Sequence, residues 1–264
     1  LREIRVASQL IELLQKLRDY AWRSGNSGLG NGARAEVFGL AHKAGKQCRA
    51  VFLLCEFGLS ECADTILRAH FETLLAERFI LKEPKPPDEC SDDLRRAKEE
   101  PLSFPAAVQP AEFRAQLYAA APLLRMNKIQ DGLGLSSDRR ERFRGEATEI
   151  EKAIGADWAK VLRGIHGYSG LSVKNLAAAY GLEDHYTKVY QPQSMHAHGG
   201  DALSHVGFDG ENLFPMHEPR GLDTRALLHL AIGLCCQFAD DLNDEFRAGL
   251  DAELRAIADE VTSW

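Results

Sequence analysis

Residues 51–81 of the chain are VFLLCEFGLSECADTILRAHFETLLAERFIL, and this stretch decides the fold. On a helix drawn through it, apolar side chains occupy nearly every side, which is typical of a helix buried at the centre of a protein. We therefore predict one long central helix over these residues. The helices that precede and follow it in the chain are expected to pack around it.

Four polar residues interrupt this stretch at helical spacing and therefore share one narrow helix face. These residues, here called the polar face, are Glu61, Thr65, Arg68 and Glu72, with Asp64 at the edge. An unpaired buried charge is costly, so we expect the carboxylates to pair with Arg68 and with groups from another helix.

The composition indicates a folded, acidic protein. Of the 264 residues, 45% are hydrophobic, which is enough for a large core. The formal net charge is −7 and no dense basic run is present, which argues against broad binding to a nucleic-acid backbone but leaves a local basic pocket open. The six cysteines form no zinc-finger pattern, so reduced thiols are expected. No apolar run approaches the length of a membrane span and the start has no signal-peptide pattern, so we expect a soluble, cytoplasmic protein with no membrane partner.

The hydrophobic pattern predicts helices and no convincing strand. We predict an all-α fold, a single multi-helix bundle with one buried central helix, which forms one domain over residues 1–264. An N-terminal helix is expected over residues 1–23, an exposed connection over 83–110, and C-terminal helices over 223–262. The residues between 206 and 221 contain glycine and proline and are expected to form a loop.

Single residues predict where other helices break, begin or end. A break at Gly45 is expected in the helix that leads into the central one, and Pro122 predicts a kink or break in a helix over residues 111–126. Ser172 is a suitable N-terminal cap, and Gly181 fits the left-handed residue that ends the same helix.

Residues 184–201, DHYTKVYQPQSMHAHGGD, contain a second group of polar side chains. A helix over roughly residues 183–198 would align every fourth residue on one face. The residues so aligned, here called the Tyr–Ser–His series, are Tyr186, Tyr190, Ser194 and His198. Pro192 would cost such a helix about 3 kcal/mol unless the helix bends there. A bend of this kind is consistent both with a functional site and with a helix that only changes direction.

Three short motifs together resemble a bacterial helical family, domain of unknown function 5677. They are A-D-x-I-L-R-A-x-F-E at residues 63–72, G-L-S-V-K-N-L-A-A-A-Y-G-L at 170–182, and Y-x-x-x-S-x-x-x-H at 190–198. The resemblance covers about residues 50–200. It implies an all-helical, intracellular bacterial protein, but it implies no known reaction. The signature positions that it implies are Arg68, Glu72, Tyr190, Ser194 and His198.

A looser analogy connects such bundles to the HEPN superfamily, many of whose members are RNases of toxin and phage-defence systems. Those enzymes carry an arginine shortly before a histidine, whereas residues 191–193 of this chain are Gln, Pro and Gln, and the pair Arg163 and His166 is too closely spaced. An RNA-acting site therefore requires Arg68 to meet His198 in space. His198 would then be the general base on a ribose 2′-hydroxyl, and Arg68 would stabilise the charge of the phosphorane.

Each of these groups also has a structural interpretation. Arg68 and its carboxylates could be an ion-pair network that fixes helix register, and we favour that interpretation over a direct catalytic role. The Tyr–Ser–His series could be a hydrogen-bonded cluster that holds a bent helix to the core, and here function and structure are equally well supported.

Two further patterns suggest metal ions. His196, His198, Asp201 and His205 carry the ligand types of zinc, iron or manganese, although their spacing matches no helical ligand motif. Residues 240–244, DDLND, match the aspartate-rich pattern that holds magnesium and diphosphate in terpene synthases and prenyltransferases. Acidic residues are plentiful in this chain, so for DDLND we predict a solvated helix face.

Three classes of function follow from the sequence. The first is an RNA-acting toxin or defence factor, the second a non-catalytic scaffold or partner-binding module, and the third a metal- or small-ligand-binding bundle centred on the histidines. The sequence requires no cofactor, and a divalent metal is one option. RNA or another protein is the expected partner, and a homodimer is also open because an apolar central helix can bury itself against a second subunit.

Overall fold

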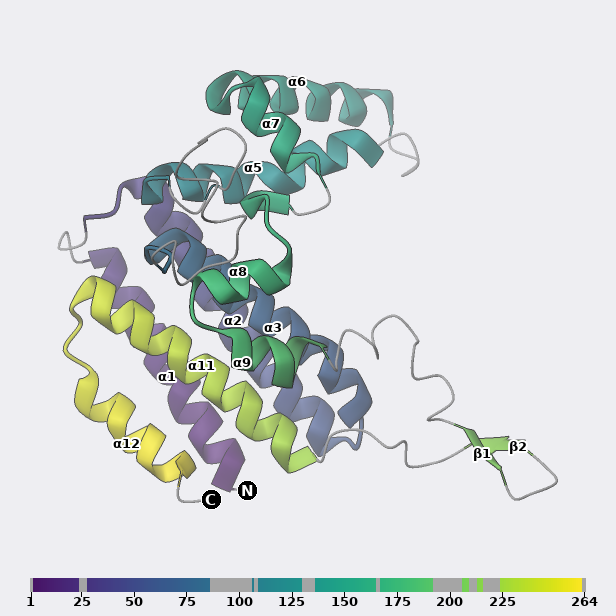
Figure 1. The fold of residues 1–264 in the computed structure, drawn as a ribbon. Coiled ribbons are helices and arrows are strands. Elements are labelled where there is room, and N and C mark those ends of the chain that lie inside the picture. Colours follow the sequence, from purple (N-terminus) through teal and green to yellow (C-terminus); the bar gives the residue numbers. More distant parts are fainter. Residues whose placement is uncertain are drawn as a thin grey trace. The chain divides into compact units, whose positions relative to one another are not determined.

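The structure is a computed structural model in which the described residues form helices and one short hairpin (Figure 1). Those residues are 2–23, 28–85, 106, 109–129, 136–164, 167–191, 206–208, 213–215 and 224–262. The predicted all-α bundle is confirmed. The segment expected to be a loop contains two short strands, β1 (Val206–Phe208) and β2 (Leu213–Pro215), which pair antiparallel with Val206 opposite Pro215.

The chain divides into two compact units. Unit 1 contains residues 1–27, 38–74 and 184–264, and unit 2 contains residues 28–37 and 75–183. The helices α2 (Asn31–Glu56) and α3 (Ser60–Leu81) each contribute residues to both units. The single domain predicted over the whole chain stays a prediction.

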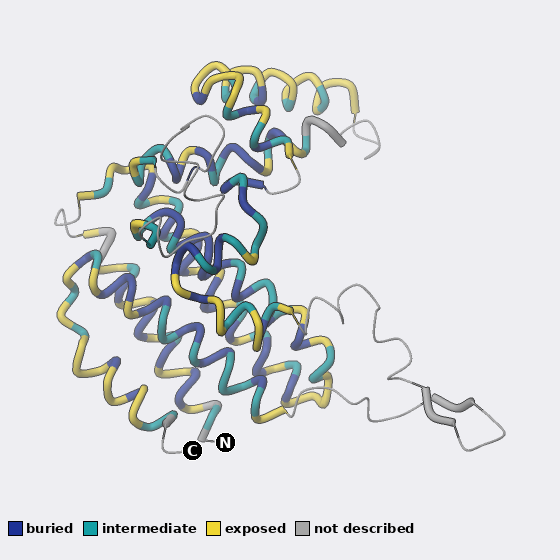
Figure 2. The backbone as a smooth tube through the Cα atoms, in the orientation of Figure 1, coloured by how far each residue is buried: buried dark blue, intermediate teal, exposed yellow. Residues whose placement is uncertain are grey.

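Unit 1 is built on three helices that contact one another, α1 (Arg2–Arg23), α11 (Thr224–Phe246) and α12 (Asp251–Thr262) (Figure 1). Each turns an apolar stripe inward, and Figure 2 shows these stripes as buried segments. The side chains of Leu10, Leu17, Leu227, Phe238 and Phe246 are buried almost completely. Burial of each such side chain contributes about 1.5–3 kcal/mol, so these stripes stabilise unit 1.

The predicted single helix over residues 51–81 is wrong, because the chain turns between Glu56 and Ser60. Gly58 adopts a φ of +72°, and the Leu59 N–H donates to the Leu54 carbonyl at 2.8 Å. A left-handed glycine followed by this bond is the usual glycine-terminated helix end. The turn also leaves Phe57 75% exposed.

Two other residues expected to interrupt helices lie inside them. α2 continues through Gly45, and α5 (Ala111–Ile129) continues through Pro122, which is exposed. The predicted break at Gly45 is therefore wrong, and at Pro122 a break is wrong, whereas the alternative of a kink stays a prediction. Packing of the remaining residues outweighs the local cost, since tertiary contacts routinely override propensity.

Unit 2 is formed by α5, α6 (Ser137–Ile154), α7 (Ala156–Leu162), a 3₁₀ turn η4 (Gly167–Ser169) and α8 (Val173–Ala179). α5 contacts α6, α7 and η4, and most of α6, whose sequence is rich in Arg and Glu, is exposed (Figure 2). Both predicted ends of α8 are confirmed. The Asn175 N–H donates to the Ser172 hydroxyl at 3.2 Å, and Gly181 has a φ of +71°.

Aromatic rings connect the helices of unit 2. Tyr168 lies 5.0 Å from Tyr118 and 5.1 Å from Phe79, measured between ring centroids. Phe113 and Trp158 meet edge to face at 5.7 Å. Pairs in these geometries contribute about 0.5–1.5 kcal/mol beyond their buried area.

The acidic motif of α11 is not a fully solvated face, so that prediction is wrong in part. Asp240 is exposed, but Asp241 and Asn243 are buried. The side chain of Asn243 accepts a hydrogen bond from the Leu250 N–H at 2.9 Å and donates one to Asp251 at 3.0 Å. Asn243 therefore connects the end of α11 to the start of α12.

Among the described residues, no helix combines the length and the apolar character needed to cross a membrane.

The buried His70 of α3 makes the stability of unit 1 depend on pH. Burial lowers the pKa of His70 from 6.5 to about 4, although the backbone of Ala231 opposes this shift. The unfolded chain therefore binds a proton near pH 6.5 that the folded protein binds only near pH 4. The free energy of unfolding therefore decreases as the pH is lowered from about 6.5 to about 4.

We expect His70 to account for a loss of about 2 kcal/mol in the free energy of unfolding between pH 7 and pH 5. Urea unfolding of the wild type and of His70→Gln at both pH values measures this contribution. The variant should lose less stability on acidification, whereas His42→Gln, which changes an exposed histidine, should behave as the wild type does. Equal losses in wild type and His70→Gln would contradict the assignment.

Candidate functional site

In unit 1, the polar face of α3 meets the first part of the Tyr–Ser–His series. The guanidinium of Arg68 donates a hydrogen bond to the Tyr190 hydroxyl at 3.0 Å. The central carbon of the same guanidinium lies 4.8 Å from the centroid of the Tyr190 ring. Arg68 thus makes both a hydrogen bond and a cation–π contact with one tyrosine.

Tyr190 is presented by a helix with unusual geometry. A single turn of α-helix, α9 (Glu183–His185), continues into the π-helix η5 (Tyr186–Tyr190). The rings of Tyr186 and Tyr190 stack at 5.5 Å, and Phe71 of α3 lies 5.9 Å from Tyr190. π-Helical turns are rare and occur frequently at functional sites.

The sequence predicted one helix over residues 183–198, and the structure describes it as far as Gln191. Residues 186–190 form a π-helical turn rather than the α-helix that the spacing of four residues predicted. Tyr186 and Tyr190 still lie on one side of the helix, because their rings stack. Outside the described residues lie the other members of the predicted catalytic and metal groups, which are Ser194, His196, His198, Asp201 and His205.

The polar face is half-exposed except at its edge, where Asp64 is buried, so the expectation that it lies in the interior is wrong in part. Arg68 approaches Glu72 at 3.4 Å, with 20% of the Arg68 side chain and 45% of the Glu72 side chain exposed. Thr65 is exposed, and Glu61 is half-buried. The Arg68 guanidinium lies over the Tyr190 ring, so Arg68 is held in place although part of its side chain reaches solvent.

The surroundings of Tyr190 keep its hydroxyl protonated. Burial raises the pKa of Tyr190, and the negative charge of Glu72 raises it further, whereas the hydrogen bond and charge of Arg68 act in the opposite direction. Because the pKa of Tyr190 lies above its ordinary value, the phenol stays neutral at physiological pH. A neutral hydroxyl can accept from Arg68 and donate to a ligand at the same time.

This arrangement offers the parts that a nucleic-acid site needs. An arginine presents planar donors that suit a phosphate group, and stacked aromatic rings suit a base. Arg68 and the pair Tyr186 and Tyr190 supply these two parts on adjacent segments. None of the three is an effective base at neutral pH, so general-base chemistry would have to come from another residue.

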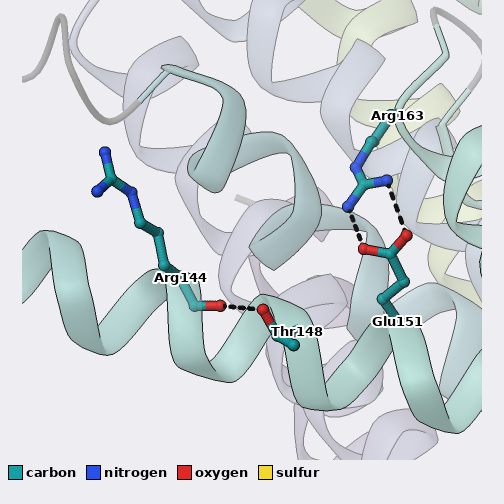
Figure 3. Close-up of polar contacts among 4 residues, drawn as sticks. All are labelled: Arg144, Thr148, Glu151 and Arg163. Carbon is teal, nitrogen blue, oxygen red and sulfur yellow. Dashed lines mark hydrogen bonds and ion pairs between the residues drawn. The ribbon is translucent and has the colours of Figure 1, made fainter.

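The local pair of Arg163 and His166 is a weaker candidate, because Arg163 is already engaged. Its guanidinium donates to both carboxylate oxygens of Glu151, at 3.3 and 2.6 Å (Figure 3). This hydrogen bond lowers the pKa of Glu151 and raises that of Arg163. Arg163 therefore connects α6 to the end of α7 within unit 2.

Sequence reasoning missed a buried arginine in unit 2. Arg114 is 1% exposed, and it donates to the Lys82 carbonyl at 2.6 Å and to Glu83 at 3.2 Å. Burial also raises the pKa of Tyr180, while the charge of Arg114 opposes this shift. A signal was present in the sequence, because Arg114 precedes Leu117 by three residues and so falls on the buried stripe of α5.

A family model, described as a family of unknown function (DUF5677), matches residues 35–213, which is more than half of the chain. The chain belongs to the DUF5677 family. The region matched by DUF5677 includes Arg68, Glu72 and Tyr190 and excludes α1, α11 and α12. No curated protein and no solved structure matches the chain. Within the part of this DUF5677 protein that the structure describes, no group of three His, Cys, Asp or Glu side chains could hold a metal ion.

The opposing effects of Glu72 and Arg68 on Tyr190 predict shifts of opposite sign in two variants. In Glu72→Gln the carboxylate is lost, so the pKa of Tyr190 should fall. In Arg68→Met the cation and its hydrogen bond are lost, so the pKa should rise. NMR titration of ring-labelled tyrosine, with the signal assigned from Tyr190→Phe, measures both shifts.

The matched control is Glu253→Gln, which removes one negative charge from the exposed surface of α12 and should leave Tyr190 unchanged. Shifts in the same direction in the two test variants would contradict the geometry.

Proposed function

We propose that the protein is a HEPN-like RNA-acting factor of toxin or defence type that works in the bacterial cytoplasm. Arg68 binds the scissile phosphate, Tyr186 and Tyr190 contact an adjacent base, and His198 is the general base. Glu72 orients Arg68, and Ser194 contributes a further polar contact. The observation that carries the proposal is the hydrogen bond between Arg68 and Tyr190.

That contact supports the proposal because it brings the start of the Tyr–Ser–His series to Arg68. Ser194 and His198 follow Tyr190 by four and eight residues in the sequence. Because Tyr190 is bound to Arg68, few residues of chain separate Arg68's partner from Ser194 and His198, and we propose that both take part in the same site. The partial exposure of Arg68 adds support, since a phosphate must reach the guanidinium from solvent.

The proposed reaction is cleavage by the adjacent ribose. His198 takes the proton of the 2′-hydroxyl, and the 2′-oxygen forms a bond to phosphorus. Arg68 stabilises the negative charge that develops on the phosphoryl oxygens. The bond from phosphorus to the 5′-oxygen then breaks, and this oxygen takes a proton from solvent. The products are a 2′,3′-cyclic phosphate and a 5′-hydroxyl.

The acidic net charge limits this function to a local site. A formal net charge of −7 disfavours binding along an extended nucleic-acid backbone, because the affinity of such binding depends on many cationic contacts to phosphates. Stacking on tyrosine and one arginine–phosphate contact suit a short, single-stranded target instead.

A second candidate is the non-catalytic scaffold. The observation that favours it is that Arg68 is engaged on two sides, by Tyr190 and by Glu72 at 3.4 Å. In that case the cluster only fixes the 184–190 segment to α3, and its loss affects stability rather than activity.

The test is cleavage of a fluorescent single-stranded RNA by the purified full chain, with detection of the 2′,3′-cyclic end. His198→Ala should reduce the rate at least about 100-fold, as expected for loss of a general base. Arg68→Ala should reduce it about 100-fold through loss of charge stabilisation. RNA with a 2′-deoxy substitution at the scissile position should not be cleaved.

Arg255→Ala is the control, because it removes an exposed cation from α12 and should retain full activity. Wild-type cleavage rates in His198→Ala would exclude the proposed role of this histidine. If no variant changes activity while Arg68→Ala lowers the unfolding temperature, the scaffold is the better assignment.

A further inference from the structure

A groove lies between α1 and α2 in unit 1, and Arg68, Glu72, Tyr186 and Tyr190 of the proposed RNA site do not line it. Its volume is about 180 Å³. The floor is apolar and is formed by Leu14 of α1 with Ala41 and Gly45 of α2. A Cβ added at Gly45 would lie 3.9 Å from Leu14 Cδ1, so the missing side chain keeps the floor open.

The rim of this groove is basic in a chain that is acidic overall. It carries Arg18 of α1 and His42, Lys46 and Arg49 of α2, and none of the described residues that line the groove is acidic. His42, Lys46 and Arg49 follow one another at intervals of four and three residues, so they share one face of α2. The groove therefore concentrates positive charge on one side of two adjacent helices.

These cations are only weakly neutralised by the protein. Arg18 donates to one carboxylate oxygen of its neighbour Asp19, at 3.0 and 2.8 Å. Among the residues that the structure describes, the side chains of Lys46 and Arg49 have no hydrogen-bond or ion-pair partner. Like charges gathered without counterions repel each other, and a bound anion relieves this repulsion.

We propose that this groove binds a small organic phosphate. The phosphate contacts Lys46, Arg49 and Arg18, and a flat apolar group lies on the floor of Leu14, Ala41 and Gly45. A phosphate fits better than a carboxylate because its additional oxygens and charge suit several cations at once. The volume suits a body the size of one aromatic ring, since a cavity of about 150 Å³ holds benzene.

The test uses phenyl phosphate as the probe, with inorganic phosphate and phenol as comparison ligands, in calorimetric titrations of the full chain. Phenyl phosphate should bind at least about tenfold more tightly than either comparison ligand, because it uses both rim and floor. Arg49→Ala and Lys46→Ala should each weaken it about tenfold, as expected for loss of one charge-assisted hydrogen bond. Binding should also weaken as salt is raised.

The matched control is Lys43→Ala, which removes the same charge from an exposed position of α2 outside the groove. Circular dichroism checks that each variant is folded, and Lys46→Arg should restore binding by keeping the charge. The proposal is overturned if phenyl phosphate does not bind, if phenol or inorganic phosphate binds equally well, or if Lys43→Ala weakens binding as much as Arg49→Ala does.

Discussion

The contact between Arg68 and Tyr190 holds together the part of unit 1 that carries the candidate site. One guanidinium supplies a hydrogen bond, a cation–π contact and an approach to Glu72. These interactions join two segments separated by more than a hundred residues, α3 and the π-helix η5. A charged side chain at a half-buried position makes the junction specific, because Arg68 must be oriented to make all three interactions with Tyr190 and Glu72.

Helix α3 has a face that is buried in the core and a face that carries the candidate site. His70 is fully buried and neutral, whereas Arg68, two residues earlier, is open to solvent on one side. Leu67, Phe71 and Leu74 of the same helix are buried in the core. A similar division occurs on α2, where Cys48 is buried and Lys46 and Arg49 are exposed at the groove. An acidic chain can therefore carry one local basic surface without being a general nucleic-acid binder.

The sequence predicted the features that depend on local chemistry. Helical periodicity located the helices, and Ser172 and Gly181 were correctly assigned as the ends of α8. The spacing of Arg68 and Glu72 correctly placed them on one face. Features that depend on packing were not predictable in this way. Periodicity does not say how deeply a face is buried, so the half-exposed polar face was expected inside, and Gly58 was overlooked while Gly45 and Pro122 were given too much weight.

A double-mutant cycle on Arg68 and Tyr190 tests the central claim most directly. The free energy of unfolding is measured in urea for the wild type, Arg68→Leu, Tyr190→Phe and the double variant. If the side chains interact as described, the two single effects should fail to add by about 1 kcal/mol. Because Tyr190→Phe keeps the ring, the cycle reports on the hydrogen bond, and additivity within about 0.3 kcal/mol would contradict the hydrogen bond between the Arg68 guanidinium and the Tyr190 hydroxyl.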